Sequence, residues 1–221
     1  GRAAPHASRS GMKTAVLQSF RTWDVPSWMR TAMDSVRAWA AARGYEHRLL
    51  DDCFLDFAPA WARWRLRTQL PAVTDLARLA WMKAALAEGF ARVIWADADL
   101  LVFDPDRFHM PEDAGHACAR ELHLFIHDDG RTEPRPGINN AVMLARAGDP
   151  FLDDYLGAAL AEAGRADPAT MPHTLLGPTL LARLARERAI PLIEGVGVFG
   201  PGLMDGIAPG GNGLPREYLR H

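Results

Sequence analysis

The chain has 221 residues, a formal net charge of −2 and 48% hydrophobic residues. This length suits one domain with a sizeable core, because domains of about 100–200 residues are the norm. The nearly balanced charge argues against a nucleic-acid or bilayer partner held by bulk electrostatics, so any anionic substrate must be held locally.

The cysteines, the apolar runs and the N-terminal segment bear on location. Cys53 and Cys118 have no paired spacing and no CxxC pattern, which fits reduced structural thiols and favours a cytoplasmic protein. No apolar run approaches the ~18 residues that span a membrane, so we expect no transmembrane segment. Residues 1–11 are small and polar; we interpret them as an expression scar and assign residues 12–221 to the domain.

The first fifty residues predict a strand, a helix and a second strand. Residues 14–20 are apolar and β-compatible, which indicates a buried strand. A helix is expected from near Trp28 to Gly44, with Ser27 as its N-cap. Residues 46–50 return as a strand. This order is typical of a parallel sheet.

Two helices and a third strand follow. We expect one helix over residues 61–70, interrupted by Pro71, and another from Thr74 as N-cap to Gly89. Residues 92–95 form a compact apolar strand that runs directly into residues 96–99. Open α/β sheets bind their ligands at such strand ends.

The rest of the chain completes an α/β domain. We expect one or two strands over residues 115–127, a strand over 140–145, a helix from Asp149 to about Gly164 and a last helix over about 175–188. Residues 195–214 are dense in Gly and Pro, and we interpret residues 195–221 as a flap that orders over the bound ligand, with a loose chain terminus as the alternative. The predicted fold is a central, mainly parallel sheet with helices on both faces.

Asp97 and Asp99 form a DxD triplet between two apolar runs. Two carboxylates at a buried strand end are costly unless a cation or a donor compensates them. A divalent ion, Mn²⁺ or Mg²⁺, bound by these carboxylates and by phosphate oxygens supplies that compensation, and it neutralises charge on a leaving diphosphate. The alternative is a strand-end turn with solvated acids.

Asp75 and Arg78 share one helical face upstream of this triplet. Near a helix N-terminus, such a pair can receive the hydroxyls of a ribose or sugar through Asp75 and reach a diphosphate through Arg78. The alternative is a surface ion pair worth a few tenths of a kcal/mol.

These residues together resemble the GT-A glycosyltransferases, a Rossmann-like nucleotide-diphospho-sugar transferase fold. The likeness is to the DxD families related to the yeast α-mannosyltransferase Och and to the glucosylating clostridial toxins, and the spacing from Arg78 to the DxD is similar to that of glycogenin-like and plant xylosyltransferase families. It covers most of the chain in order, through Trp23, Pro26, Trp28, Tyr45, Arg48, Asp51, Asp52, Asp75, Arg78, Asp97, Asp99, Asn139, Asn140, residues 150–152, Gly177 and Pro178. Gln18 stands in the first strand, where the family has a His-Gln pair.

The resemblance implies a metal-dependent transfer of a sugar from a UDP- or GDP-sugar to a glycan, protein or small-molecule acceptor, with retention. It implies that Asp99 contacts the metal directly, while Asp97 reaches the ribose or a metal-bound water. It assigns Asn140 to the catalytic centre beside these aspartates. Donor binding would further involve Asp75, Arg78, Gln18, Asn139 and Gly177.

Two histidines are candidates for a third metal ligand, which GT-A sites often take from the C-terminal part of the chain. They are His173 and His221; for each, a solvated or core histidine is the alternative. Asn139 and Asn140 have an alternative as an ordinary turn after Pro136 and Gly137.

Two other functions compete. A metal-dependent nucleotidyltransferase or phosphohydrolase also uses strand-end aspartates, yet residues 17–23 contain no glycine for a phosphate loop and no DxDxT pattern is present. A non-catalytic nucleotide-sugar-binding domain would not need the combination of Asp75, Arg78, Asp97 and Asp99.

Overall fold

The computed structural model describes residues 13–127, 129, 131–197, 204, 208 and 210. The predicted expression scar, residues 1–11, and most of the predicted flap, including His221, lie outside the described residues.

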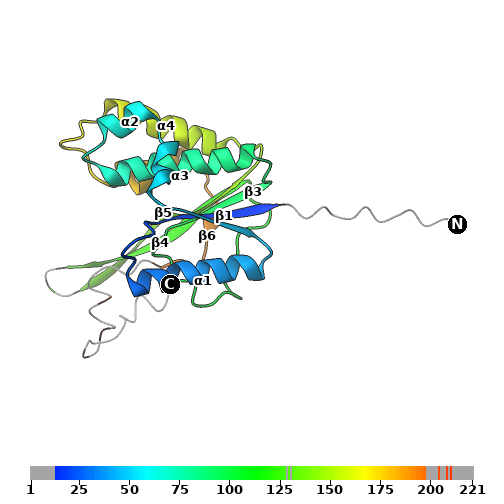
Figure 1. The fold of residues 1–221 in the computed structure, drawn as a ribbon. Helices are drawn as coiled ribbons and strands as arrows, with labels where there is room; N and C mark the ends of the chain where they lie inside the picture. Colours follow the sequence, from blue (N-terminus) through cyan, green and yellow to red (C-terminus); the bar gives the residue numbers. More distant parts are fainter. Residues whose placement is uncertain are drawn as a thin grey trace.

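Helices and strands alternate along the first part of the chain, and a long hairpin follows (Figure 1). In chain order, the elements are β1 (Thr14–Ser19), α1 (Ser27–Ala42), β2 (Glu46–Leu50), η1 (Asp52–Phe57), α2 (Ala60–Arg65), α3 (Leu70–Ala87), β3 (Arg92–Ala96), β4 (His116–Ile126), β5 (Thr132–Arg146), α4 (Phe151–Arg165), η2 (Leu175–Thr179), α5 (Leu180–Glu187) and β6 (Leu192–Ile193).

One six-stranded sheet organises the described residues, in the order β2-β1-β3-β5-β4-β6. β1 is parallel to β2 and β3, and β4 is parallel to β6. β5 runs antiparallel to both of its neighbours, β3 and β4. The other five strands therefore point the same way, which confirms the predicted single α/β domain with a mainly parallel sheet.

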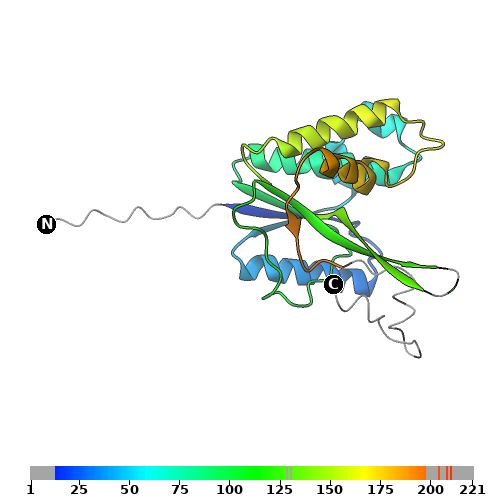
Figure 2. The same cartoon turned by 180° about the vertical axis from the view of Figure 1, so that it is seen from behind.

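Helices cover both faces of this sheet. α1 packs on one face, where Val36 and Trp39 share a buried cluster with strand residues such as Val16 and Ile94. α3, α4 and α5 cover the other face (Figures 1 and 2). The predicted helices on both faces are confirmed.

The strands explain this two-sided packing. Successive side chains of a strand point to opposite faces, and in β1 Ala15 and Leu17 join the cluster under α3 while Val16 joins the one under α1. Strands that are buried on both faces must be apolar throughout. This is why residues 15–17 and 93–96 are continuous apolar runs.

The predicted N-cap of one helix and the predicted start of another are wrong. α1 includes Ser27, and Pro26 is its N-cap, without a side-chain hydrogen bond. α3 begins at Leu70 rather than after Thr74. Pro71 lies in its first turn, where a proline costs no hydrogen bond because the first N–H groups of a helix have no partner in it. The Thr74 hydroxyl instead donates to the Pro71 carbonyl at 2.7 Å.

The second half also differs in detail from the expectation. Residues 116–126 form one strand, β4, and β5 begins at Thr132, well before residue 140. Pro136 and Gly137 therefore lie inside a strand, so the turn considered as the alternative for Asn139 and Asn140 is wrong. The last helix is divided into η2 and α5, with non-helical backbone at Gly177.

Both cysteines are free: Cys53 is exposed and Cys118 is buried. Burial raises the pKa of the Cys118 thiol far above its ordinary value, which makes it an inert core side chain. Among the described residues, no helix combines the length and apolar character needed to cross a bilayer.

Candidate functional site

The ends of β1 and β3 lie next to each other at one edge of the sheet. Gln18, near the end of β1, is fully buried, and its Nε2 donates to the backbone carbonyl of Asp97 at 3.1 Å. The Gln18 Oε1 lies 2.9 Å from His47 Nε2 on β2. Gln18 thus connects the end of β1 to Asp97, the residue that follows β3.

A bulge in β5 shapes the same edge. Cys118 pairs with Met143 and the next residue, Ala119, pairs with Asn139, so residues 140–142 have no partners on β4. Inside the bulge, the Ala141 carbonyl accepts a hydrogen bond from Asp97 N–H at 2.8 Å, and Asn139 Oδ1 accepts one from Ala141 N–H at 2.7 Å. Bulges commonly re-aim side chains next to functional sites; here the bulge turns Asn140 into the interior.

Asp75 and Arg78 project from α3 toward this bulge, and both are buried, at 6% and 8% exposed. Asn140 Nδ2 donates to Asp75 Oδ1 at 2.9 Å, and Arg78 Nη1 donates to the Asn140 carbonyl at 2.9 Å. Arg78 Nη2 lies 3.5 Å from Asp75 Oδ1. The surface ion pair considered for these two residues is therefore wrong. Both residues also lie beyond the first turn of α3, so the helix N-terminus does not contribute to them.

Asp97 connects the DxD triplet to this network. Its Oδ1 lies 3.2 Å from Arg78 Nη1 and accepts a hydrogen bond from Trp95 Nε1 at 2.7 Å. The chain then turns, with Leu100 N–H donating to the Asp97 carbonyl at 3.1 Å, and Asp99 emerges in solvent. The two aspartates of the triplet therefore have different positions: Asp97 faces the interior and Asp99 faces outward.

Gly177 closes the network from the other side. A Cβ built on this glycine would lie 2.8 Å from Asp75 Oδ2 and 2.9 Å from Asn140 Nδ2, closer than real Cβ atoms approach such groups. Tyr155, fully buried on α4, donates through its hydroxyl to the carbonyls of Leu176 and Gly177 at 3.1 and 3.2 Å. Only glycine lets this backbone pass so close to the buried pair.

We expect Gly177→Ala to lower the free energy of unfolding by about 1–3 kcal/mol, the range of overpacking in a filled interior. The added methyl group must displace Asp75 or Asn140, and either displacement strains the hydrogen bond between these two buried side chains. Gly157→Ala is the matched control, because nothing lies within 4 Å of a Cβ at Gly157 in α4, and this change should instead stabilise by roughly 0.5–1 kcal/mol. Urea unfolding of both variants measures the difference. Equal stability of the two variants would refute the close packing at Gly177.

The network has more acidic than basic groups. Asp75, Asp97 and Asp99 surround the single guanidinium of Arg78, which interacts electrostatically with all three. Burial raises the pKa of both Asp75 and Asp97, Arg78 opposes that rise, and each carboxylate has a neighbouring one that adds to it. An added cation would relieve this excess negative charge.

This donor set fits a hard divalent ion. Mg²⁺ is commonly bound by one or two protein carboxylates together with substrate phosphates, rather than by a complete protein cage, and Asp97 and Asp99 are two oxygen donors on one turn. Among residues 13–127, 129 and 131–197, no three His, Cys, Asp or Glu side chains gather as a metal cage. His173 is exposed before η2 and does not complete such a group, while His221 lies outside the described residues.

A pocket of about 700 Å³ adjoins the network. It is bounded by the β4–β5 hairpin and by η2 and α5, and its lining includes Glu121, Asn139, Pro178, Arg183 and Arg186. Asn139 and Pro178 are the chain neighbours of Asn140 and Gly177, so the pocket opens directly beside the buried cluster. The Asn139 Nδ2 donates to Glu121 Oε1 at 3.2 Å on its wall.

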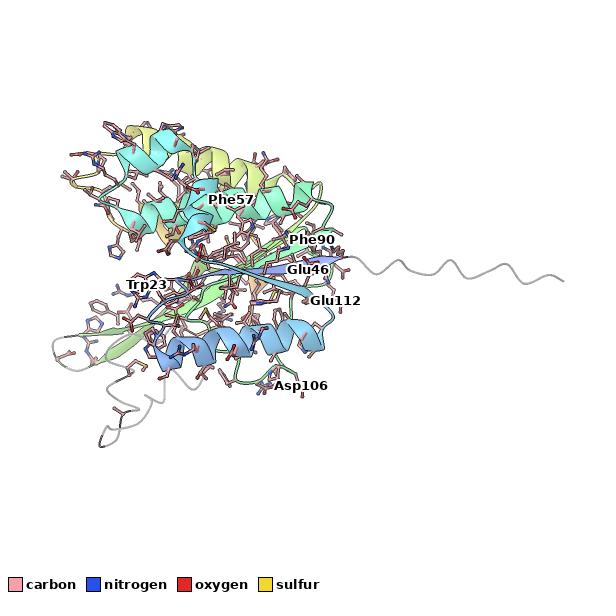
Figure 3. All side chains as sticks on the ribbon, in the orientation of Figure 1. Trp23, Glu46, Phe57, Phe90, Asp106 and Glu112 are labelled. Atoms are coloured by element: carbon pink, nitrogen blue, oxygen red, sulfur yellow. The ribbon has the colours of Figure 1, made fainter. Side chains whose placement is uncertain are left out.

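The sequence did not identify several residues of this region. Trp95 was interpreted only as a strand residue, although its indole N–H holds Asp97, and Tyr155 only as part of a helix. Nothing local to either residue shows these contacts, since their partners are revealed only by the fold. Trp23 and Trp28, two of the residues that carry the resemblance, are exposed, at 65% and 60%. Figure 3 shows Trp23 at the side from which the β4–β5 hairpin projects.

Fold and site define an α/β domain whose parallel strands end at a buried Asp–Arg–Asn cluster, with an exposed carboxylate and an open pocket beside it. No protein-family model matches the sequence, and no curated protein matches it either. Among solved structures, the chain is similar to a glycosyltransferase involved in the glycosylation of the major capsid of PBCV-1. The two are 15% identical, the match covers 86% of this chain and 82% of that one, and the TM-score is 0.44.

Proposed function

We propose that this protein is a metal-dependent glycosyltransferase of the GT-A type. It transfers a sugar from a UDP- or GDP-sugar to a hydroxyl group of a glycan, protein or small-molecule acceptor, with Mn²⁺ or Mg²⁺ at Asp97 and Asp99. Nucleic acid is not among the proposed partners.

The observation that carries this proposal is a convergence of segments distant in sequence. Asp75 and Arg78 from α3, Asp97 after β3 and Asn140 from the β5 bulge are joined by direct contacts of 2.9–3.5 Å. Ligands of open α/β sheets bind outside the carboxyl ends of the strands, and this cluster lies there. The resemblance assigns Asp75, Arg78 and Asp97 to donor binding and Asn140 to the catalytic centre.

The contacts support a distinct role for each residue. Asp99, exposed and without a hydrogen bond or ion pair among the described residues, is available as the direct metal ligand. Asp97 is held by Trp95 and Arg78 through one oxygen, so its other oxygen is left for the donor ribose or a metal-bound water. Arg78 contacts Asp75, Asp97 and the Asn140 carbonyl, and we assign it to positioning Asp97 rather than to the diphosphate.

The remaining predicted residues lie around the cluster and have positioning or binding roles. Gln18 holds the Asp97 backbone, and Gly177 permits close packing on Asp75. Asn139 lines the pocket, where it can meet the sugar or the acceptor. The third metal ligand, proposed as His173 or His221, would have to approach Asp97 and Asp99 together with the donor.

In the reaction, the bond between the anomeric carbon and the β-phosphate oxygen breaks, and a bond from that carbon to the acceptor oxygen forms. The nucleoside diphosphate leaves with the bonding electrons, and its departing phosphate oxygen takes up the proton that the acceptor hydroxyl loses. A bound metal ion supplies charge stabilisation to that leaving group. We propose retention of the anomeric configuration, on the basis of the resemblance.

Two alternatives predict different products. A nucleotidyltransferase or phosphohydrolase would cleave within the diphosphate and give a sugar phosphate, whereas glycosyl transfer cleaves at the anomeric carbon and gives a nucleoside diphosphate. The connection from β1 to α1, residues 20–26, contains no glycine that could form a phosphate loop. A non-catalytic domain would bind the donor and release nothing.

The test is incubation of the protein with a panel of UDP- and GDP-sugars and Mn²⁺, followed by phosphorus NMR. We expect slow release of a nucleoside diphosphate from one donor, with water as the acceptor, and loss of that release in Asp97→Asn. Release of a sugar phosphate would assign the protein to the phosphate-cleaving class instead. Donor binding without any product would favour the non-catalytic alternative.

A further inference from the structure

The pocket beside the cluster has a charge pattern that indicates its ligand. Two cationic side chains from α5, Arg183 and Arg186, line it together with one acidic side chain, Glu121 from β4. Arg183 and Arg186 are three residues apart and therefore lie on one face of the helix. The lining thus carries two cationic side chains against one acidic side chain.

The two arginines differ in their partners. Arg183 Nη2 lies 3.0 Å from Glu162 Oε2 on α4, a carboxylate that it shares with Arg165, so this guanidinium already has an acidic partner. Arg186 has no hydrogen bond or ion pair within residues 13–127, 129 and 131–197. An arginine guanidinium presents a planar set of donors that matches a phosphate or a carboxylate in two-point contact. Arg186 is therefore the cation of the pocket that can accept an anionic partner.

The other polar residues of the lining suit hydroxyl groups. Glu121 accepts a hydrogen bond from Asn139 Nδ2 at 3.2 Å, and the hydroxyls of Thr174, just before η2, and Thr179, at its end, lie 3.0 Å apart. All four side chains line the pocket. Carboxylate, amide and hydroxyl groups can each exchange hydrogen bonds with a sugar ring.

We propose that this pocket binds the acceptor, and that the acceptor is a sugar carrying a negatively charged group, a phosphate or a carboxylate, which pairs with Arg186. The assignment as acceptor rests on the proposed glycosyl transfer, because the pocket opens beside Asn140 and Gly177 rather than at Asp99. The anionic preference rests on the lining residues alone. Arg186 is a binding residue here and takes no part in the chemistry.

The experiment is a titration of ¹⁵N-labelled protein, without nucleotide or metal, followed by amide shifts in NMR. The probes are glucose 6-phosphate, glucuronate and glucose, so that phosphate and carboxylate are compared with a neutral sugar. We expect shifts at Asn139, Ala182 and their neighbours, and at least about tenfold tighter binding of one anionic sugar than of glucose, as for a charge-assisted hydrogen bond pair. The glucose affinity serves as the baseline.

Two variants distinguish a specific contact with the Arg186 guanidinium from an effect of the protein's total charge. Arg186→Gln should reduce the preference for the anionic sugar to less than about threefold. Arg37→Gln removes the same charge from an exposed site on α1, on the other face of the sheet, and should leave the preference unchanged. Equal binding of charged and neutral sugars by the unaltered protein overturns the proposal, as does an equal loss in both variants.

Nucleotide separates this proposal from the proposed function. If UDP with Mn²⁺ displaces the anionic sugar completely, the pocket belongs to the donor diphosphate and the acceptor assignment is wrong. If neither UDP nor GDP binds while the Arg186-dependent preference persists, the anion site stands and glycosyl transfer does not. If nucleotide binds but the protein shows no preference for the anionic sugar, the anion site is wrong and the proposed glycosyl transfer is unaffected.

Discussion

Replacement of Arg78 by methionine is expected to lower the free energy of unfolding by about 3–5 kcal/mol at neutral pH. The variant keeps Asp75 and Asp97 in place without the guanidinium that lies 3.5 and 3.2 Å from their oxygens, and it also removes the donor to the Asn140 carbonyl. Removing one partner of a buried pair costs more than the pair itself contributes. Urea unfolding measures the loss.

Two comparisons show whether the loss comes from uncompensated charge. Arg37→Met, at an exposed pair with Asp34, should change stability by no more than about 0.5 kcal/mol. Arg78→Met combined with Asp75→Asn should be more stable than Arg78→Met alone, because one buried charge is gone. An additive loss in the double variant would contradict this explanation.

The loss should also depend on pH. Burial raises the pKa of Asp75 and Asp97, and without Arg78 their folded-state pKa values must rise further. The unfolded pKa of an aspartate is near 3.9. A carboxyl whose pKa is higher than this in the folded protein stabilises the fold at low pH, where it is protonated, and this contribution is lost as pH rises through the folded pKa. The deficit of Arg78→Met should therefore grow as pH rises from about 4 through the raised folded pKa. A deficit that shrinks as pH rises would show that charge is not its cause.

The sequence predicted the parts of this fold that depend on local pattern. The apolar character of residues 14–20 and 92–95 predicted two buried strands, and the strand–helix–strand opening predicted that the strands at 14–20 and 46–50 are parallel. The position of Asp97 directly after an apolar strand gave the location of the site at the sheet edge. In each case the signal lies within a few consecutive residues.

What the sequence could not predict depends on contacts between distant residues. Nothing near Asn140 indicates that three residues of β5 lack partners on β4, because the mismatch is a property of the pair of strands. The burial of Asp75 and Arg78 likewise depends on Asn140 and Gly177, which lie more than sixty residues away. Pro71 was misinterpreted because a proline can either end a helix or occupy its first turn.

The resemblance supplied what pattern alone could not, since it grouped Asp75, Arg78, Asp97, Asn140 and Gly177 in one site, and the structure brings these residues together. The chemical roles of these residues, and those of His173 and His221, stay predictions. The role that can be tested most directly is the one predicted for Asp99. As the exposed carboxylate beside an acidic cluster, it should provide the direct contact to the metal.

We expect Asp99→Ala to weaken metal-dependent binding of a nucleoside diphosphate by about 100-fold, equivalent to about 2.7 kcal/mol. Without a bridging cation, the diphosphate would meet Asp97 and Asp75 with only Arg78 to compensate, so repulsion would oppose binding. The fold should survive, because Asp99 is exposed. Asp106→Ala is the matched control: this aspartate is exposed in the same loop and lies below α1 in the view of Figure 3.

Isothermal titration of the unaltered protein with UDP and with GDP, each in Mn²⁺ and in EDTA, tests the central claim most directly. The account predicts that one of the two nucleotides binds in Mn²⁺, that its affinity falls by about 100-fold in EDTA, and that Asp99→Ala but not Asp106→Ala reproduces the fall in the presence of Mn²⁺. Equal affinity in Mn²⁺ and EDTA, or unchanged binding by Asp99→Ala, would contradict a metal-bridged diphosphate site at Asp97 and Asp99.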